Sequence, residues 1–110
     1  MLQEQTCLSW KSFHTYLTAT FEHLFITKTF ADVTFVLEDQ TQIQAHKVIL
    51  SACSPILKQL LLNTPDSHPL IYLEGAKEKE LQSILHFMYF GEVRINPESI
   101  NDFLSLAMSL

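Results

Sequence analysis

The stretch from residue 30 to residue 55 constrains the fold most, because its hydrophobic period changes from that of strands to that of a helix. Residues 33–37 form an almost unbroken apolar run, which predicts a buried strand. Residues 42–45 alternate polar and apolar side chains, as a strand with one solvated face does. The polar residues 38–41 predict a tight turn between them, with Asp39 suited to a strained position. We therefore expect a hairpin that leads directly into helical sequence.

Helical patterns follow the hairpin. Residues 48–52 fit a short buried helix, and Ser54 is suited to cap the next helix that Pro55 opens. The downstream pattern predicts a helix over 55–62, a strand over 70–73, a helix over 77–89 ended by Gly91, a minimal edge strand over 93–95, and a last helix opened by Asn96 and Pro97. The expected inner face of that last helix consists of Ile100, Phe103, Leu104, Ala107 and Met108. This mixture of strands and helices predicts an α+β (mixed α/β) domain.

The first 25 residues carry two different patterns. From residue 13 onward apolar side chains recur at helical spacing, at Phe13, Tyr16, Leu17, Phe21, Leu24 and Phe25. Residues 6–10 instead fit a short strand, in which Cys7, Leu8 and Trp10 are apolar, but no neighbouring segment offers a hairpin partner. A lone strand must pair with a distant segment or with another chain. On the sequence alone both alternatives stay open.

The composition limits the possible functions. A chain of 110 residues makes one domain. Charged residues make up 17% of it, against an average of about 25%, which indicates that part of the surface is covered by another chain. The net charge of −5 argues against direct nucleic-acid contact. No apolar stretch approaches the roughly 20 residues of a membrane span, no signal peptide is recognisable, and two cysteines fit a reducing compartment.

No residue pattern points to catalysis. The five histidines share no ligand spacing with one another or with the two cysteines, so no metal site is predicted. Gly75 and Gly91 are the only glycines, which leaves no phosphate-binding loop. His46 is expected to be a satisfied polar core residue, and Cys53 an inert buried thiol. We expect neither an enzyme nor a cofactor.

Three strings give the chain a close resemblance to a known family. Residues 45–55 read AHKVILSACSP, residues 87–93 read FMYFGEV, and residues 32–35 read DVTF. In these strings the chain resembles the BTB/POZ domain, an α/β dimerisation module, and the match runs from about residue 7 to the chain end. It is most similar to the insect tramtrack type, which has an aromatic-Cys-Leu-Arg-Trp-Asn-Asn signature near its N-terminus. Cys7, Leu8 and Trp10 match that signature, and Thr6, Ser9, Lys11 and Ser12 depart from it.

The resemblance implies both a fold and an assembly. The fold is a small, mostly three-stranded sheet capped by a cluster of about five to six helices. In the family's dimers the N-terminal strand crosses to the partner, and the first helices pack across the two-fold axis. The implied dimer interface consists of Cys7, Leu8, Trp10, Phe13, Tyr16, Leu17 and Phe21. Packing of the aromatic stripe inside a single chain is the alternative.

Asp32 and Lys47 flank the apolar runs of the hairpin segment. The pattern alone favours an acid at a strand start and a lysine at a helix start, both facing water. The resemblance implies instead that Asp32 and Lys47 line a charged pocket at the dimer groove. That reading requires the two side chains to lie close together and on one face.

The resemblance also implies a function. The chain is expected to be a protein–protein interaction domain of a transcription or chromatin regulator in the nucleus, with DNA contact left to downstream zinc fingers and with no membrane contact. Its expected partners are itself, as a homodimer or a higher multimer, and other BTB proteins or co-regulators. The alternative is a substrate adaptor for a cullin-type ubiquitin ligase. Such adaptors carry a hydrophobic-x-Glu pattern where this chain has Leu60, Leu61 and Leu62, without the acid.

The expected domain organisation follows from these patterns. Residues 1–5 are polar and are predicted to be flexible, and residues 6–110 form the BTB/POZ domain. The last helical pattern has no stop signal at Leu110, which predicts that the helix is cut short there.

Overall fold

The computed structural model describes residues 3–110. Across this range the elements are α1 (Phe13–Thr27), β1 (Val33–Leu37), β2 (Gln42–Ala45), α2 (Lys47–Cys53), α3 (Pro55–Leu62), β3 (Leu70–Leu73), α4 (Glu78–Phe90), the 3-10 turn η1 (Pro97–Ser99) and α5 (Ile100–Ser109). The predicted α+β class is confirmed. Of the residues expected to be flexible, 1 and 2 lie outside the described range, and 3–5 are exposed and without regular structure.

The three strands form one sheet in the order β2-β1-β3. β1 pairs antiparallel with β2, so that Phe35 lies opposite Ile43, and parallel with β3, so that Phe35 lies opposite Ile71. In the predicted hairpin turn Oδ1 of Asp39 accepts a 3.0 Å hydrogen bond from the Thr41 N–H. The left-handed residue of this turn is Gln40, with φ of 72°, and not Asp39.

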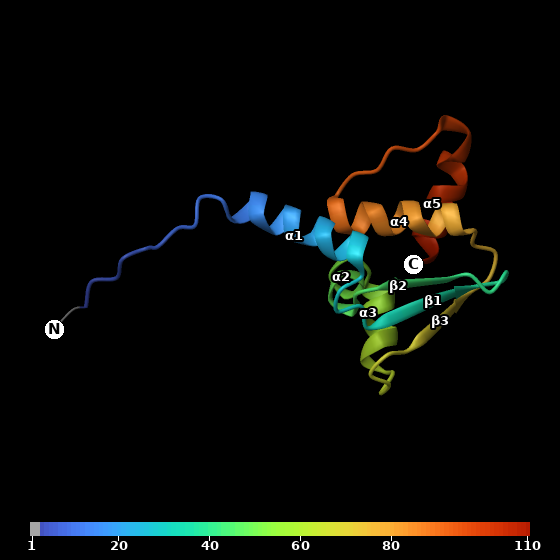
Figure 1. Cartoon of the computed structure of the whole chain (residues 1–110), viewed down its shortest axis with the longest axis horizontal. Coiled ribbons are helices and arrows are strands. Elements are labelled where there is room, and N and C mark those ends of the chain that lie inside the picture. The colour runs from blue at the N-terminus through green and yellow to red at the C-terminus, as the bar shows by residue number, and fades with distance from the viewer. Residues whose placement is uncertain (1–2) are drawn as a thin grey trace.

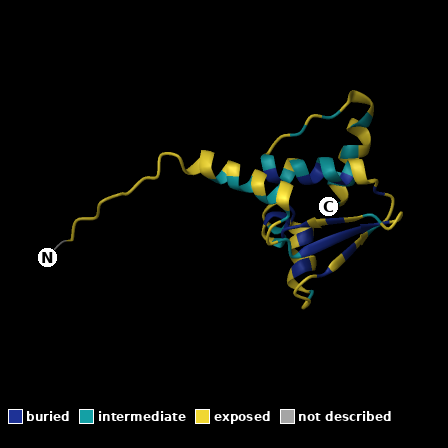
Figure 2. Cartoon of the chain, in the orientation of Figure 1, coloured by how far each residue is buried: buried dark blue, intermediate teal, exposed yellow. Residues whose placement is uncertain are grey.

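The core lies between the sheet and the helices. Phe35 on the central strand is fully buried and packs with Leu50 of α2, Leu57 of α3 and Leu81 of α4 in one hydrophobic cluster. In Figure 1, α4 lies along one face of the sheet, and α2 and α3 gather toward its left end. Every residue of β1 is buried, which Figure 2 shows as an unbroken dark blue strand. The unbroken apolar run of the sequence has this burial as its cause.

Two predicted helix ends are confirmed, whereas Asn96 and Pro97 open the 3-10 turn η1 and α5 begins only at Ile100. The Ser54 side-chain oxygen accepts a 3.1 Å hydrogen bond from the Leu57 N–H, and Pro55 occupies the first turn of α3. Gly91 ends α4 in the left-handed conformation, with φ of 78°. Its N–H donates a 2.8 Å hydrogen bond to the carbonyl of Phe87. These positions are local, so sequence signals alone could predict them.

Two predicted strands are absent from the single chain. Residues 6–10 are extended and exposed, and residues 93–95 also lack strand pairing. A strand exists only through its ladder of backbone hydrogen bonds, and in residues 3–110 neither segment has one to another strand. The resemblance implied a first strand paired in a dimer, and a single chain does not test that expectation.

The predicted inner face of α5 is wrong in part. Phe103 and Ala107 are partly buried as expected, together with Leu106 and Leu110. Ile100, Leu104 and Met108 instead are 44%, 48% and 83% exposed. The helix carries apolar side chains on two adjoining faces, and its packing against α4 through Phe103 and Phe87 selects one of them.

Candidate functional site

The N-terminal part of α1 is an apolar surface without a partner. No residue of this fifteen-residue helix is buried, and the segment before it extends away from the domain (Figure 1). Trp10, Phe13 and Tyr16 are 57%, 41% and 60% exposed. The Trp10 ring centroid lies 5.3 Å from that of Phe13 and 5.2 Å from that of Tyr16. We call these three residues the aromatic cluster. An exposed apolar cluster of this kind marks an interaction surface.

The structure divides the predicted interface residues into two groups. Cys7 and Leu8 lie on the exposed N-terminal segment, and Leu8 is 91% exposed. Leu17 is half-buried, whereas Phe21 packs against the core of its own chain. Phe25, one turn after Phe21, also packs inward. Packing inside the single chain therefore applies at the end of the stripe, and its exposed start is left as the predicted interface (Figure 2).

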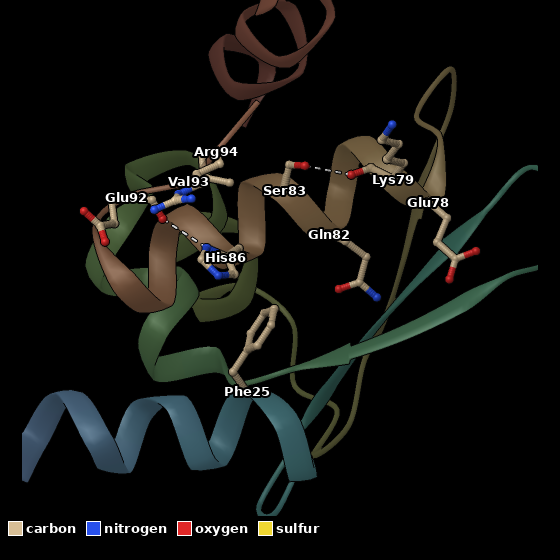
Figure 3. A pocket seen from close by; sticks show the side chains of 9 residues that line it. All are labelled: Phe25, Glu78, Lys79, Gln82, Ser83, His86, Glu92, Val93 and Arg94. Carbon is tan, nitrogen blue, oxygen red and sulfur yellow. Dashed lines mark hydrogen bonds between the residues drawn. The ribbon is translucent and has the colours of Figure 1, made fainter. Parts of the chain in front are cut away.

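Between α1 and α4 lies a groove with a volume of about 830 Å³. Its lining comes from the end of α1, one face of α4 and the chain after α4: Phe25, Glu78, Lys79, Gln82, Ser83, His86, Glu92, Val93 and Arg94. Figure 3 shows Phe25 facing the α4 side chains while the 92–94 segment passes the end of α4. We call this space the α1–α4 groove. The sequence predicted the segments around it but not their convergence.

The α1–α4 groove has an aromatic floor and a charged rim. His86 stacks on Phe90 at 4.3 Å between ring centroids, and Phe25 meets His86 edge-on at 5.7 Å. Nδ1 of His86 lies 3.0 Å from the carbonyl oxygen of Glu92, to which it donates, and so ties the 92–94 segment to α4 (Figure 3). Two acids and two bases surround this floor: Glu78, Glu92, Lys79 and Arg94.

A lysine lies at the C-terminal end of α1. Lys28, in the left-handed conformation with φ of 59°, ends the helix. Its Nζ lies 4.5 Å from the centroid of the Phe25 ring. Burial lowers the pKa of this lysine from its ordinary value, because removal from water disfavours the charged form.

Asp32 and Lys47 lie close together, but the Asp32 carboxylate contacts the backbone N–H of Lys47 and not its ammonium group. Oδ1 of Asp32 accepts a 2.7 Å hydrogen bond from the Lys47 N–H, at the first residue of α2. Nζ of Lys47 donates to the carbonyl oxygens of Asp66 and Ser67, at 3.1 and 3.2 Å. Asp32 thus satisfies a free donor at a helix start, and Lys47 holds the loop before β3. A pocket between the two side chains stays a prediction.

Two other expectations concern single residues. His46 is 4% exposed and fully hydrogen-bonded, so its place in the polar core is confirmed. Cys53 is not buried as expected: it is exposed at the end of α2, and its thiol lies 3.6 Å from the carbonyl oxygen of Met88. Partial removal from water still raises the pKa of the Cys53 thiol.

Within residues 3–110, no three side chains of the His, Cys, Asp and Glu types come together as a metal site would require. In the same range no helix combines the length and the apolar character needed to span a bilayer. The candidate site is the exposed surface formed by the N-terminal segment, the aromatic cluster and the α1–α4 groove.

A family model matches most of the chain. Residues 21–110 match the model of the BTB/POZ domain. The chain belongs to the BTB/POZ family. Domains of this family mediate dimerisation and other protein–protein contacts. The match begins within α1, so the aromatic cluster and the segment before it precede the matched residues.

Individual proteins extend the similarity to the N-terminal segment. The chain is 45% identical over 104 residues to Longitudinals lacking protein-like of Drosophila melanogaster, covering 94% of this chain and 81% of that protein. It is 38% identical over 110 residues to the alpha isoform of tramtrack from the same organism, covering all of this chain but 13% of tramtrack. The predicted similarity to the tramtrack type is confirmed.

The fold matches solved structures of the family. The BTB domain of human gigaxonin superimposes with a TM-score of 0.78 at 25% identity, covering 97% of this chain and 87% of that one. The family model and the similarity to tramtrack favour an interaction domain of the regulator type over the cullin adaptor. The residues Leu60, Leu61 and Leu62 near the end of α3 agree, since no acid follows the apolar residue there.

Proposed function

We propose that this chain is a homodimerisation domain of a nuclear transcription or chromatin regulator, and that it acts by joining copies rather than by catalysis. One observation carries the proposal: α1 is fifteen residues long and buries none of them. In water a helix owes most of its stability to the packing of an apolar face. The aromatic cluster at the start of α1 finds such packing when it meets the same cluster of a second copy.

In this proposal the exposed N-terminal segment pairs with a second extended segment of the other copy. Residues 6–10 and residues 93–95 are both extended without strand pairing, although both carry strand-like sequence. The 92–94 segment lines the α1–α4 groove. We expect residues 6–10 of one copy to pair with residues 93–95 of the other. This pairing gives the backbone groups of both segments hydrogen-bond partners and directs Leu8 and Trp10 toward apolar surroundings. Folding and dimerisation are then coupled.

Asp32 and Lys47 enter the proposal as the contact for a further partner. The Asp32 carboxylate accepts one backbone hydrogen bond and keeps other lone pairs, and the Lys47 ammonium carries a third proton beyond its two carbonyl contacts. A co-regulator peptide that offers both charges fits this pair. Asp32 lies just before β1 and Lys47 just after β2, so the two charges flank the hairpin.

The regulatory role rests on the tramtrack-type relationship. The chain corresponds to 13% of the length of tramtrack. In this proposal, contact with DNA is left to segments outside the domain. A dimer raises the effective concentration of two attached DNA-binding segments at neighbouring sites. The net charge of −5 agrees with a domain that does not touch DNA itself.

Light scattering of the purified chain over a range of concentrations tests the proposal. We expect the mass of two or more chains, and a form that lacks residues 1–10 should self-associate more weakly or aggregate. A single-chain mass that persists at micromolar concentration would contradict homodimerisation. Unchanged mass and stability after the truncation would contradict the exchange of the N-terminal segment while leaving helix-to-helix dimerisation in place.

A further inference from the structure

A second surface without a partner lies at the β3 edge of the sheet. Leu70 and Tyr72 of β3 are 51% and 70% exposed, and Leu60 of α3 is 45% exposed. All three line a shallow groove of about 260 Å³. None of them belongs to the N-terminal segment, the aromatic cluster or the α1–α4 groove. The dimer proposed above therefore leaves this apolar surface in contact with water.

The backbone of β3 is free on its outer side. β3 is an edge strand, with β1 on its inner side. Thr34 lies opposite Leu70, and the Thr34 N–H donates a 3.1 Å hydrogen bond to the carbonyl of Pro69. In a parallel ladder this register turns the backbone groups of Ile71 toward β1. The N–H and C=O groups of Leu70 and Tyr72 therefore point outward.

Nothing in β3 blocks the addition of another strand. Natural edge strands are usually protected by a lysine, a proline or a bulge. β3 reads LIYL, with no charge, proline or glycine. The side chains that share its outer sheet face are also uncharged: Thr34, Val36, Gln42 and Gln44. Chains of net charge −5 repel one another, but the four residues of β3 bring no charge to such a contact.

We propose that β3 pairs antiparallel with β3 of a second copy, about a two-fold axis at Ile71, and that this contact joins dimers into larger assemblies. Alternation of side chains allows only registers that keep core-facing residues opposite core-facing residues. The register with Leu70 opposite Tyr72 of the second copy meets this condition. Each of these residues then donates one backbone hydrogen bond and accepts one, because their free groups form the closely spaced pairs of an antiparallel ladder.

The proposal rests on the homodimer proposed above and extends it. Each chain of a dimer carries one β3 edge, so a dimer offers two equivalent contacts of this kind. The pairing is isologous, because the same residues contribute from both sides. Assemblies built in this way grow by whole dimers, and the two sheets merge into one continuous sheet.

Substitution of Tyr72 tests the contact. Tyr72→Lys places a charge on each side of the two-fold axis, as protective lysines do at natural edges. Leu62→Lys is the matched control, since Leu62 is 67% exposed and is absent from the groove at β3. In sedimentation velocity of the whole chain we expect the wild type and Leu62→Lys to exceed the mass of two chains as concentration rises. Tyr72→Lys should stop at two chains.

The outcomes separate the two proposals. Multimers of Tyr72→Lys as large as those of the wild type overturn the β3 contact. A wild type that stays at two chains at every concentration also overturns it, leaves the homodimer intact, and assigns the face to another partner or to solvent. A wild type that is a single chain at every concentration contradicts the homodimer and the β3 contact together.

Disulfide trapping tests the register directly. In a background of Cys7→Ser and Cys53→Ser, the Leu70→Cys and Tyr72→Cys proteins are mixed and oxidised. Opposite residues of a hydrogen-bonded antiparallel pair have Cα atoms about 5.5 Å apart, within disulfide reach. We expect the mixture to cross-link efficiently and each protein alone to cross-link poorly, because like residues are offset by two positions along the strands. Equal cross-linking in the three samples overturns this register.

Discussion

The hydroxyl oxygen of Tyr89 lies 2.6 Å from Nδ1 of His46 and 2.9 Å from the backbone nitrogen of the same residue. Nε2 of His46 lies 2.7 Å from the carbonyl oxygen of Thr29, which can only accept, so Nε2 carries a proton. In the neutral ring Nδ1 then accepts from the Tyr89 hydroxyl, which itself accepts from the His46 N–H. The network joins the loop after α1, the start of α2 and the end of α4.

Removal of the Tyr89 hydroxyl should destabilise the fold. Tyr89→Phe leaves the His46 N–H and Nδ1 without this partner in a site that is 4% exposed. Leaving buried polar groups unpaired costs about 1–3 kcal/mol. Urea unfolding measures the loss, with Tyr72→Phe as control because Tyr72 is 70% exposed. Equal stability of the two variants would show that water or a shifted ring replaces the hydroxyl.

The same residue should make stability depend on alkaline pH. Burial raises the pKa of Tyr89 from 10.0 to about 12, since the buried phenolate is disfavoured. A pKa that is higher in the folded state keeps this contribution complete below pH 10 and removes it as pH rises toward about 12. The difference in unfolding free energy between wild type and Tyr89→Phe should therefore shrink between pH 10 and pH 12. A difference that stays constant across this window would contradict the predicted shift.

Asp32 should contribute to stability through the start of α2. Asp32→Ala removes the acceptor of the Lys47 N–H, and loss of such a cap costs about 0.5–2 kcal/mol. Asp66→Ala serves as control, because Lys47 contacts the backbone carbonyl of Asp66, which this change retains. Thermal unfolding compares the two. A loss no larger than that of Asp66→Ala would indicate that water satisfies the helix start.

A charge in the aromatic cluster should weaken the dimer without unfolding the chain. Tyr16→Lys places a like charge on both copies at a residue that is 60% exposed in the single chain. Thr15→Lys is the matched control on the same helix, since Thr15 lies beside Thr18 and Glu22 on a different surface. Sedimentation at low concentration should show more single chains for Tyr16→Lys. Equal dissociation of both variants would show that the aromatic cluster is not the contact between the two copies.

Most of the fold was predictable because its signals are local. The change of period between residues 30 and 55, the Ser54–Pro55 cap and Gly91 depend on neighbours along the chain, and the structure confirms all of them. The inner face of α5 was predicted less well. An amphipathic helix with two apolar faces can dock by either, and only the contact of Phe103 with Phe87 selects one.

The candidate site was predictable in its members but not in its arrangement. Trp10, Phe13 and Tyr16 were expected at an interface, and they are exposed on one surface. Phe21 has the same helical spacing but packs inward, because the end of α1 meets α4. The α1–α4 groove has no sequence signal of its own, since its lining residues come from three segments.

By itself, the sequence determined all the helices, three strands and the family of the chain, because apolar period, caps and motif strings are properties of neighbouring residues. It also predicted strands over residues 6–10 and 93–95, which need a pairing partner that neighbouring residues do not supply. Only the tertiary structure decided which apolar residues form the core and which lack a partner. The Lys47 ammonium, for example, bonds the carbonyls of Asp66 and Ser67, nearly twenty positions away. Burial depends on what a residue meets in space, and residues distant in sequence decide that.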